Sequence, residues 1–97
     1  MAKAKPDPEP TDLTVGRTYY FSTCKFDYVG RLLAVDTPYG VRLTEASRVF
    51  NTGRFHEFMR DGRAAAMEIE PYPPGFAVGL QWVDWSPWPH PLPTEAV

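Results

Sequence analysis

Apolar and polar residues alternate along much of the chain, which is the pattern of half-buried β-strands. In 41–46, VRLTEA, the apolar Val41 and Leu43 alternate with Arg42 and Thr44. Other segments are rich in aromatic and β-branched residues, which strands favour. The predicted strands are 17–26, 28–36, 41–46, 66–72 and 75–85. The sequence therefore predicts a mainly β protein.

Turn residues separate these segments. In 37–40, TPYG, Pro38 fixes a turn φ and Gly40 permits a positive φ. The run Pro73-Pro74-Gly75 predicts a second turn. We expect the first three strands to form an antiparallel meander.

The hydrophobic period changes in the middle of the chain. Phe55, Phe58 and Met59 stand at i, i+3 and i+4, which places them on one face of a helix. This predicts a short helix at about 53–60. We expect Asn51 to cap its N-terminus, with Phe50 and Phe55 as a hydrophobic staple. Gly62 suits the left-handed position after the helix.

Five or six short strands and one small helix favour a strongly bent, five-stranded barrel of Sm-like or SH3-like type, because closure removes exposed strand edges. Gly30 lies inside a predicted strand and indicates a sharp bend or a close backbone approach. The chain divides into a proline-rich disordered arm at 1–12, a β domain at 13–85 and a proline-rich tail at 86–97.

The length and charge limit the class of protein. The 97 residues predict one domain with a small core, which oligomerisation can stabilise. The net charge of −2 gives no overall basic surface for nucleic acid. Cys24 is the single cysteine, so no internal disulfide can form. We expect a cytoplasmic protein without membrane contact, since neither a membrane span nor a secretory signal is visible.

The segment 28–43, YVGRLLAVDTPYGVRL, resembles the first motif of the Sm-like family. The matching positions are Gly30, Leu32, Asp36, Gly40 and Leu43. The resemblance implies a bent five-stranded barrel that assembles into rings by pairing edge strands. We expect structural roles for Gly30, Asp36 and Gly40, with Asp36 closing a strand before the turn, where an Asp commonly bonds its own backbone.

The residues of the family's RNA pocket are not matched. Gly40 stands where the family has an Asn, and Pro38 stands where it has a stacking side chain. The late Arg-Gly pair is also missing. The resemblance therefore implies the architecture without the uridine site.

No catalytic or metal-binding pattern is visible, so we expect neither an enzyme nor a cofactor. The chain has no Ser/His/Asp or Cys/His signature and no phosphate-binding loop. His56 and Glu57 are on the predicted helix and Asp61 directly follows it, but His56 and Glu57 point about 100° apart. A solvated helix surface explains these residues without a metal.

Arginines and aromatic residues alternate around the predicted helix. Such an arrangement can bind single-stranded RNA or DNA by charge and stacking. The candidate contacts are Arg48, Arg54, Arg60 and Arg63. Glu45, Glu57 and Asp61 offset much of their charge.

Three tryptophans lie within seven residues near the C-terminus: Trp82, Trp85 and Trp88. Large aromatic side chains anchor interfaces, and they also fill cores. The leading hypothesis is a non-enzymatic structural protein that assembles with itself, as a ring or higher assembly, through these tryptophans and its strand edges. The alternatives are a nucleic-acid-binding Sm-like protein with its site at 48–63 and an SH3-like peptide-binding module. Capping of the chain's own barrel is the other role open to the tryptophans.

Overall fold

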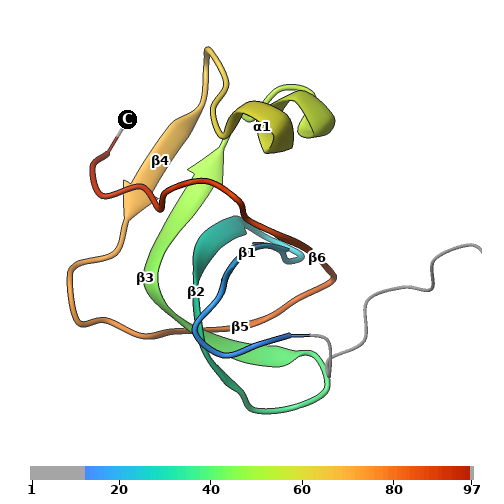
Figure 1. The fold of residues 1–97 in the computed structure, drawn as a ribbon, viewed down its shortest axis with the longest axis vertical. Helices are drawn as coiled ribbons and strands as arrows, with labels where there is room; N and C mark the ends of the chain where they lie inside the picture. The colour runs from blue at the N-terminus through green and yellow to red at the C-terminus, as the bar shows by residue number, and fades with distance from the viewer. Residues whose placement is uncertain (1–12, 97) are drawn as a thin grey trace, which may run out of the picture.

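Six antiparallel strands and one short helix make up the computed structural model, which describes residues 13–96 (Figure 1). The predicted arm at 1–12 lies outside the described residues. The elements are β1 (Thr18–Ser22), β2 (Asp27–Val35), β3 (Gly40–Phe50), α1 (Phe55–Asp61), β4 (Glu68–Pro71), β5 (Val78–Gln81) and β6 (Asp84–Pro87). The prediction of a mainly β chain with one short helix is confirmed.

The sheet is organised around β3. One edge of β3 pairs with β2, while its other edge pairs with β5 in the N-terminal half and with β4 in the C-terminal half. β1 pairs with β2 and also with β6, which gives the path β4-β3-β2-β1-β6. This path leaves the sheet unclosed, and with β5, which pairs with β3 outside the path, the sheet has six strands instead of the five expected.

The predicted strand at 75–85 is divided in two. The backbone N–H of Trp82 donates to Tyr39 O at 2.9 Å, and that of Val83 donates to Ser22 O at 2.7 Å. The chain thus passes from β5, on β3, to β6, on β1. The sheet curls back on itself (Figure 1) although β5 and β6 do not pair with each other.

The helix ends as predicted but begins differently. Gly62 has a φ of 74° and donates its N–H to Phe58 O at 2.7 Å. The N-cap is Arg54, which makes no side-chain capping bond, so the prediction of Asn51 was wrong. Asn51 has a φ of 55°, and its Nδ2 donates to Glu68 at 3.3 Å. Phe50 therefore does not stand in the staple position.

Two glycines of the Sm-like pattern stand where a Cβ would be crowded by neighbouring atoms. A Cβ on Gly30 would lie 3.2 Å from Cα of Ala46 and 3.2 Å from Cβ of Leu43. Gly30 also lies in an irregular register between β2 and β3, in agreement with the predicted close approach. Gly40 does not have the positive φ that we expected. A Cβ there would meet Oγ1 of Thr37 at 2.5 Å, so any other residue at position 40 would require the Thr37 side chain to shift.

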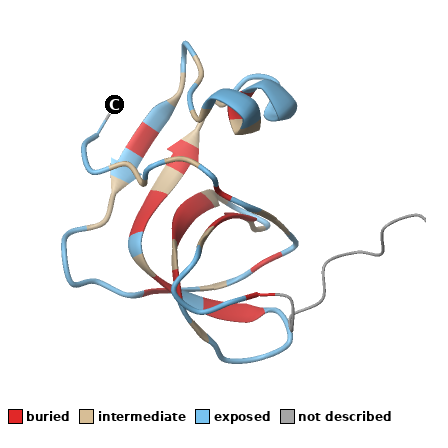
Figure 2. Cartoon of the chain, in the orientation of Figure 1, coloured by how far each residue is buried: buried red, intermediate tan, exposed pale blue. Residues whose placement is uncertain are grey.

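Both faces of the sheet bury apolar side chains (Figure 2). Tyr19 and Phe21 of β1 belong to a larger cluster on one face, while Tyr20 points to the other. This second face holds Tyr20, Val29, Val49, Phe58 and Trp88. The helix and the C-terminal segment cover it, so the predicted tail begins inside the folded body.

Within the described residues, no helix is both long enough and apolar enough to span a membrane.

Candidate functional site

The three tryptophans pack within their own chain. Trp82 is 7% exposed and Trp88 is 4% exposed. The Trp82 ring lies 5.2 Å from that of Tyr39, and Trp88 lies 5.3 Å from Phe58. Trp85 is half-buried against Tyr19. This arrangement agrees with the alternative in which the tryptophans cap their own fold. It leaves little tryptophan surface exposed for contact with a second copy of the chain.

The structure does not gather the four candidate arginines. Arg60 pairs with its neighbour Asp61 at 2.9 Å. Arg54 and Arg63 line a hollow beside α1, whereas Arg48 lies on the sheet over the ring of Phe26. A continuous basic stripe for a nucleic-acid backbone is therefore not present on this segment.

Asp36 forms an ion pair with Arg42 across the β2–β3 hairpin. Its two carboxylate oxygens accept hydrogen bonds from Arg42 at 2.9 and 3.1 Å. Its backbone N–H donates to Gly40 O at 2.8 Å, which closes the turn. Asp36 thus has a structural position in the β2–β3 hairpin, with the side chain bonded to Arg42 and not to the turn backbone.

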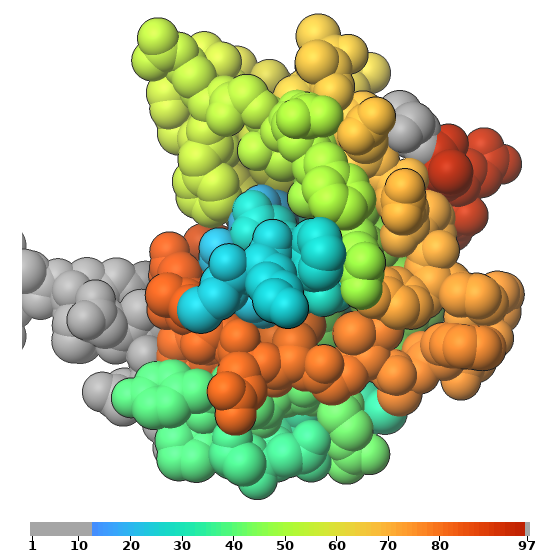
Figure 3. Space-filling view, turned by 180° about the vertical axis from the view of Figure 1, so that it is seen from behind, coloured from blue at the N-terminus to red at the C-terminus, as the bar shows by residue number. Residues whose placement is uncertain are grey.

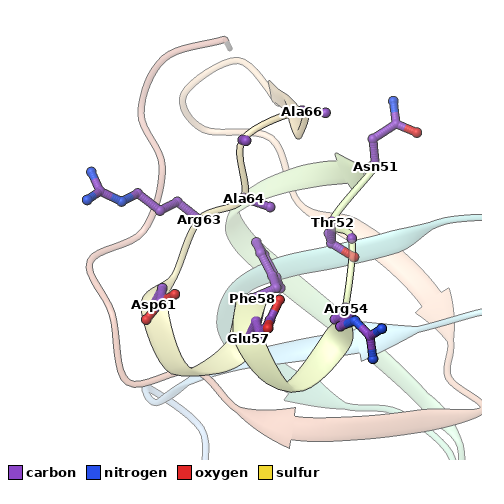
Figure 4. A pocket seen from close by; sticks show the side chains of 11 residues that line it. Asn51, Thr52, Arg54, Glu57, Phe58, Asp61, Arg63, Ala64 and Ala66 are labelled. Atoms are coloured by element: carbon purple, nitrogen blue, oxygen red, sulfur yellow. The ribbon is translucent and has the colours of Figure 1, made fainter.

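The hollow beside α1 has a volume of about 590 Å³ and lies between 51–54 and 63–66 (Figure 4). Arg54 and Arg63 line it together with Glu57 and Asp61, so its formal charges cancel. In Figure 4 the Arg63 side chain extends away from Phe58. This hollow does not favour a ligand of either charge.

A smaller cavity of about 150 Å³ lies where β1, β2 and β6 meet the start of α1. Its lining residues are Tyr20, Ser22, Asp27, Phe55, Asp84, Trp85 and Ser86. We call this cavity the acidic pocket, because two carboxylates and no basic side chain line it. Seen from behind, the chain around residue 25 (cyan) lies against the chain around 80–86 (orange), in agreement with the pairing of β1 with β6 (Figure 3).

Strand register places the two carboxylates in one row. Ser22 of β1 is paired with Asp84 of β6 on one side and with Asp27 of β2 on the other. Directly paired residues point to the same face of an antiparallel sheet. The Cα atoms of Asp27 and Asp84 are therefore roughly 10 Å apart, which is two strand spacings.

Neutral donors hold the carboxylate of Asp27. Ser22 Oγ donates to it at 2.9 Å, and the hydroxyl of Tyr20 donates to its other oxygen. Burial, followed by the hydrogen bond to Asp27, raises the pKa of Tyr20 well above its usual value. Tyr20 therefore stays protonated and remains a donor.

Neither aspartate is neutralised by a basic side chain of residues 13–96. The ion pairs there are Arg31–Glu45, Arg42–Asp36 and Arg60–Asp61. Among the described residues, Asp84 accepts a hydrogen bond only from the backbone N–H of Trp85, at 2.9 Å. Phe55 lies beside these carboxylates, 48% exposed, with its ring 5.5 Å from that of Tyr20. The pocket thus combines negative charge with an exposed aromatic ring.

Sequence reasoning missed Asp27, Asp84 and Phe55 as a group. The row depends on the pairing of β1 with β6, which joins distant parts of the chain. The local sequence carries no signal for that pairing. In the part of the chain that the structure describes, no three His, Cys, Asp or Glu side chains gather as a metal site.

No family model, curated protein or solved structure matches the chain.

Proposed function

We propose that the protein is a non-enzymatic interaction module that binds a segment of a partner protein, with a basic side chain of that segment in the acidic pocket. The carrying observation is the row formed by Asp27, Ser22 and Asp84, whose two carboxylates lack a basic partner among the described residues. This proposal develops the peptide-binding alternative and places the site on β1, β2, β6 and α1.

The chemistry of the pocket suits a lysine or arginine side chain. Its volume of about 150 Å³ admits the end of one long side chain. An ammonium or guanidinium group there would form charge-assisted hydrogen bonds with carboxylate oxygens. The exposed ring of Phe55 offers packing to the methylene groups and cation–π attraction to the charge.

We further infer that the frame of this module is a small, strongly bent barrel in which β5 and β6 are two halves of one bent strand. The supporting observation is the link Trp82-Val83, which joins a strand on β3 to a strand on β1. This frame fixes the row of carboxylates on paired strands, while Phe55 comes from the helix.

Selection from a random peptide display library tests the proposed function. We expect enriched peptides to contain a lysine or arginine, and Asp84→Asn to weaken their binding about tenfold, the effect of losing one charge-assisted contact. Phe55→Ala should weaken binding similarly. The matched controls are Asp36→Asn and Phe76→Ala, which lie outside the pocket. Peptides that bind all four variants equally well, or the absence of any enriched peptide, would contradict the proposal.

A further inference from the structure

Arg48 is held rigidly above aromatic rings, on a different part of the sheet from the acidic pocket. Its guanidinium carbon lies 4.2 Å from the ring centroid of Phe26 and 5.7 Å from that of Tyr72. Its Nε donates to the hydroxyl of Tyr72 at 3.0 Å. A guanidinium fixed in this way loses little conformational entropy when it binds a ligand.

Glu70 is the direct cross-strand partner of Arg48, yet the two side chains form no ion pair. Opposite charges at such positions normally attract each other. Here Arg48 is drawn over Phe26 instead. Its Nε is engaged by the hydroxyl of Tyr72, and the side chain of Tyr28 also lies near the guanidinium, with its ring centroid 6.0 Å from the guanidinium carbon. The two terminal nitrogens of Arg48 form no hydrogen bond with the described residues at hydrogen-bonding distance, so these N–H groups can serve as donors to a ligand.

Arg48 and Glu70 line the same surface hollow. This hollow has a volume of about 230 Å³, and Pro71, Tyr72 and Pro73 complete it. It therefore presents fixed donors from Arg48 and acceptors from Glu70 beside an aromatic ring. A complementary ligand needs acceptors and donors side by side on a rigid, flat group.

We propose that this hollow binds a guanine base. Guanine offers O6 and N7 as a pair of acceptors for a guanidinium. Its N1–H and amino group are donors that a carboxylate accepts, and its ring can stack on Tyr72. Adenine lacks the acceptor pair, and the pyrimidines offer a smaller surface for stacking. Arg48 and Glu70, which form no ion pair with each other, would thus distinguish guanine from the other three bases. This site is separate from the acidic pocket and does not depend on the proposed function.

Charge around the hollow favours the base over its phosphates. Glu68 and Glu70 are both on β4, and the hollow contains Arg48 as its single basic side chain. Added phosphate would meet repulsion from the two carboxylates. We therefore expect guanosine to bind at least as well as guanosine monophosphate.

Titration of the isotope-labelled protein with the four nucleosides, followed by NMR, tests the site. We expect guanosine to give saturable shifts of the amides of Arg48, Glu70 and Tyr72. Adenosine, cytidine and uridine should bind at least about fivefold more weakly. Inosine lacks the amino group and should also bind more weakly than guanosine, because Glu70 then loses one donor.

Arg48→Lys and Glu70→Gln should each weaken guanosine binding about tenfold, which is the scale of a lost bidentate contact. Arg31→Lys and Glu45→Gln are the matched controls. These two residues lie on the adjacent strands β2 and β3 and already form an ion pair with each other at 2.6 Å. The same spectra show whether each variant is folded. Equal binding of all four nucleosides would show stacking without recognition, and it would overturn the proposal. Absence of a saturable guanosine shift would also overturn it. Acetamide, a small amide without a ring, serves as a further probe, and shifts equal to those with guanosine would indicate a site for amide groups and overturn the proposal.

Discussion

At the residue scale, Gly30 controls how closely β2 approaches β3. A valine there would bring branched atoms against Ala46 and Leu43, where even a Cβ would lie only 3.2 Å away. We expect Gly30→Val to lower the free energy of unfolding by about 1–3 kcal/mol, as overpacking commonly does. Urea denaturation followed by circular dichroism measures this change.

Gly79→Ala provides the control for this substitution. Gly79 is also in a strand, but a Cβ there would find its nearest neighbour, in Arg42, only at 4.0 Å. We expect a much smaller change at this position. If Gly30→Val is as well tolerated as Gly79→Ala, the close approach of β2 to β3 is not a constraint on the fold.

Tyr20 makes stability depend on alkaline pH. Its pKa is raised in the folded protein, so its favourable contribution is complete below the unfolded value of about 10 and falls above it. Above that pH the unfolded chain binds fewer protons than the folded one. We expect the free energy of unfolding to fall by up to about 1.4 kcal/mol per pH unit from this group. Tyr20→Phe should flatten that slope in urea titrations between pH 10 and 11.5, and an unchanged slope would contradict the assignment.

At the scale of elements, the C-terminal segment holds the second apolar face together. Trp88 packs on Tyr20 and Phe58, while its backbone N–H donates to Thr18 O at 3.0 Å. We expect Trp88→Ala to lower the free energy of unfolding by about 3–5 kcal/mol, the usual cost of truncating a buried aromatic side chain. Thermal or urea unfolding measures this loss.

Phe76→Ala is the control for Trp88→Ala, because Phe76 is largely exposed and should change stability by less than about 0.5 kcal/mol. Sedimentation of the folded Trp88→Ala protein separates the two roles of the tryptophan. We expect its native mass to equal that of the unmodified protein, since Trp88 packs on its own chain. A lower mass would show that Trp88 joins separate copies.

Elements with a strong local period could be predicted from the sequence, and elements set by distant pairing could not. The spacing of Phe55, Phe58 and Met59 located the helix within two residues. By contrast, β3 extends to Phe50 because β4 pairs with its second half. The interruption at Trp82-Val83 likewise results from a change of partner strand, which leaves no trace in the alternation of residue types.

At the scale of the whole molecule, both proposed sites lie where paired strands bring distant residues together. Asp27 and Asp84 are ordinary strand-end residues in the sequence, and only the β2-β1-β6 register makes them neighbours. Arg48 was a candidate from the sequence, but its partner Glu70 appears only through the β3–β4 register. The Sm-like resemblance and assembly into a ring stay predictions, and the native mass tests the latter.

The pairing of β1 with β6 has a consequence for the order of folding. Tyr20 and Ser86 are directly paired although 66 positions separate them (86 minus 20). The β1-β2-β3 meander needs only short loops, whereas this ladder must close a long one, and long-range contacts form at a greater entropic cost. We infer that β6 joins last. The acidic pocket then exists only once the chain has finished folding. A ligand bound there would bind the native state alone and would raise the free energy of unfolding.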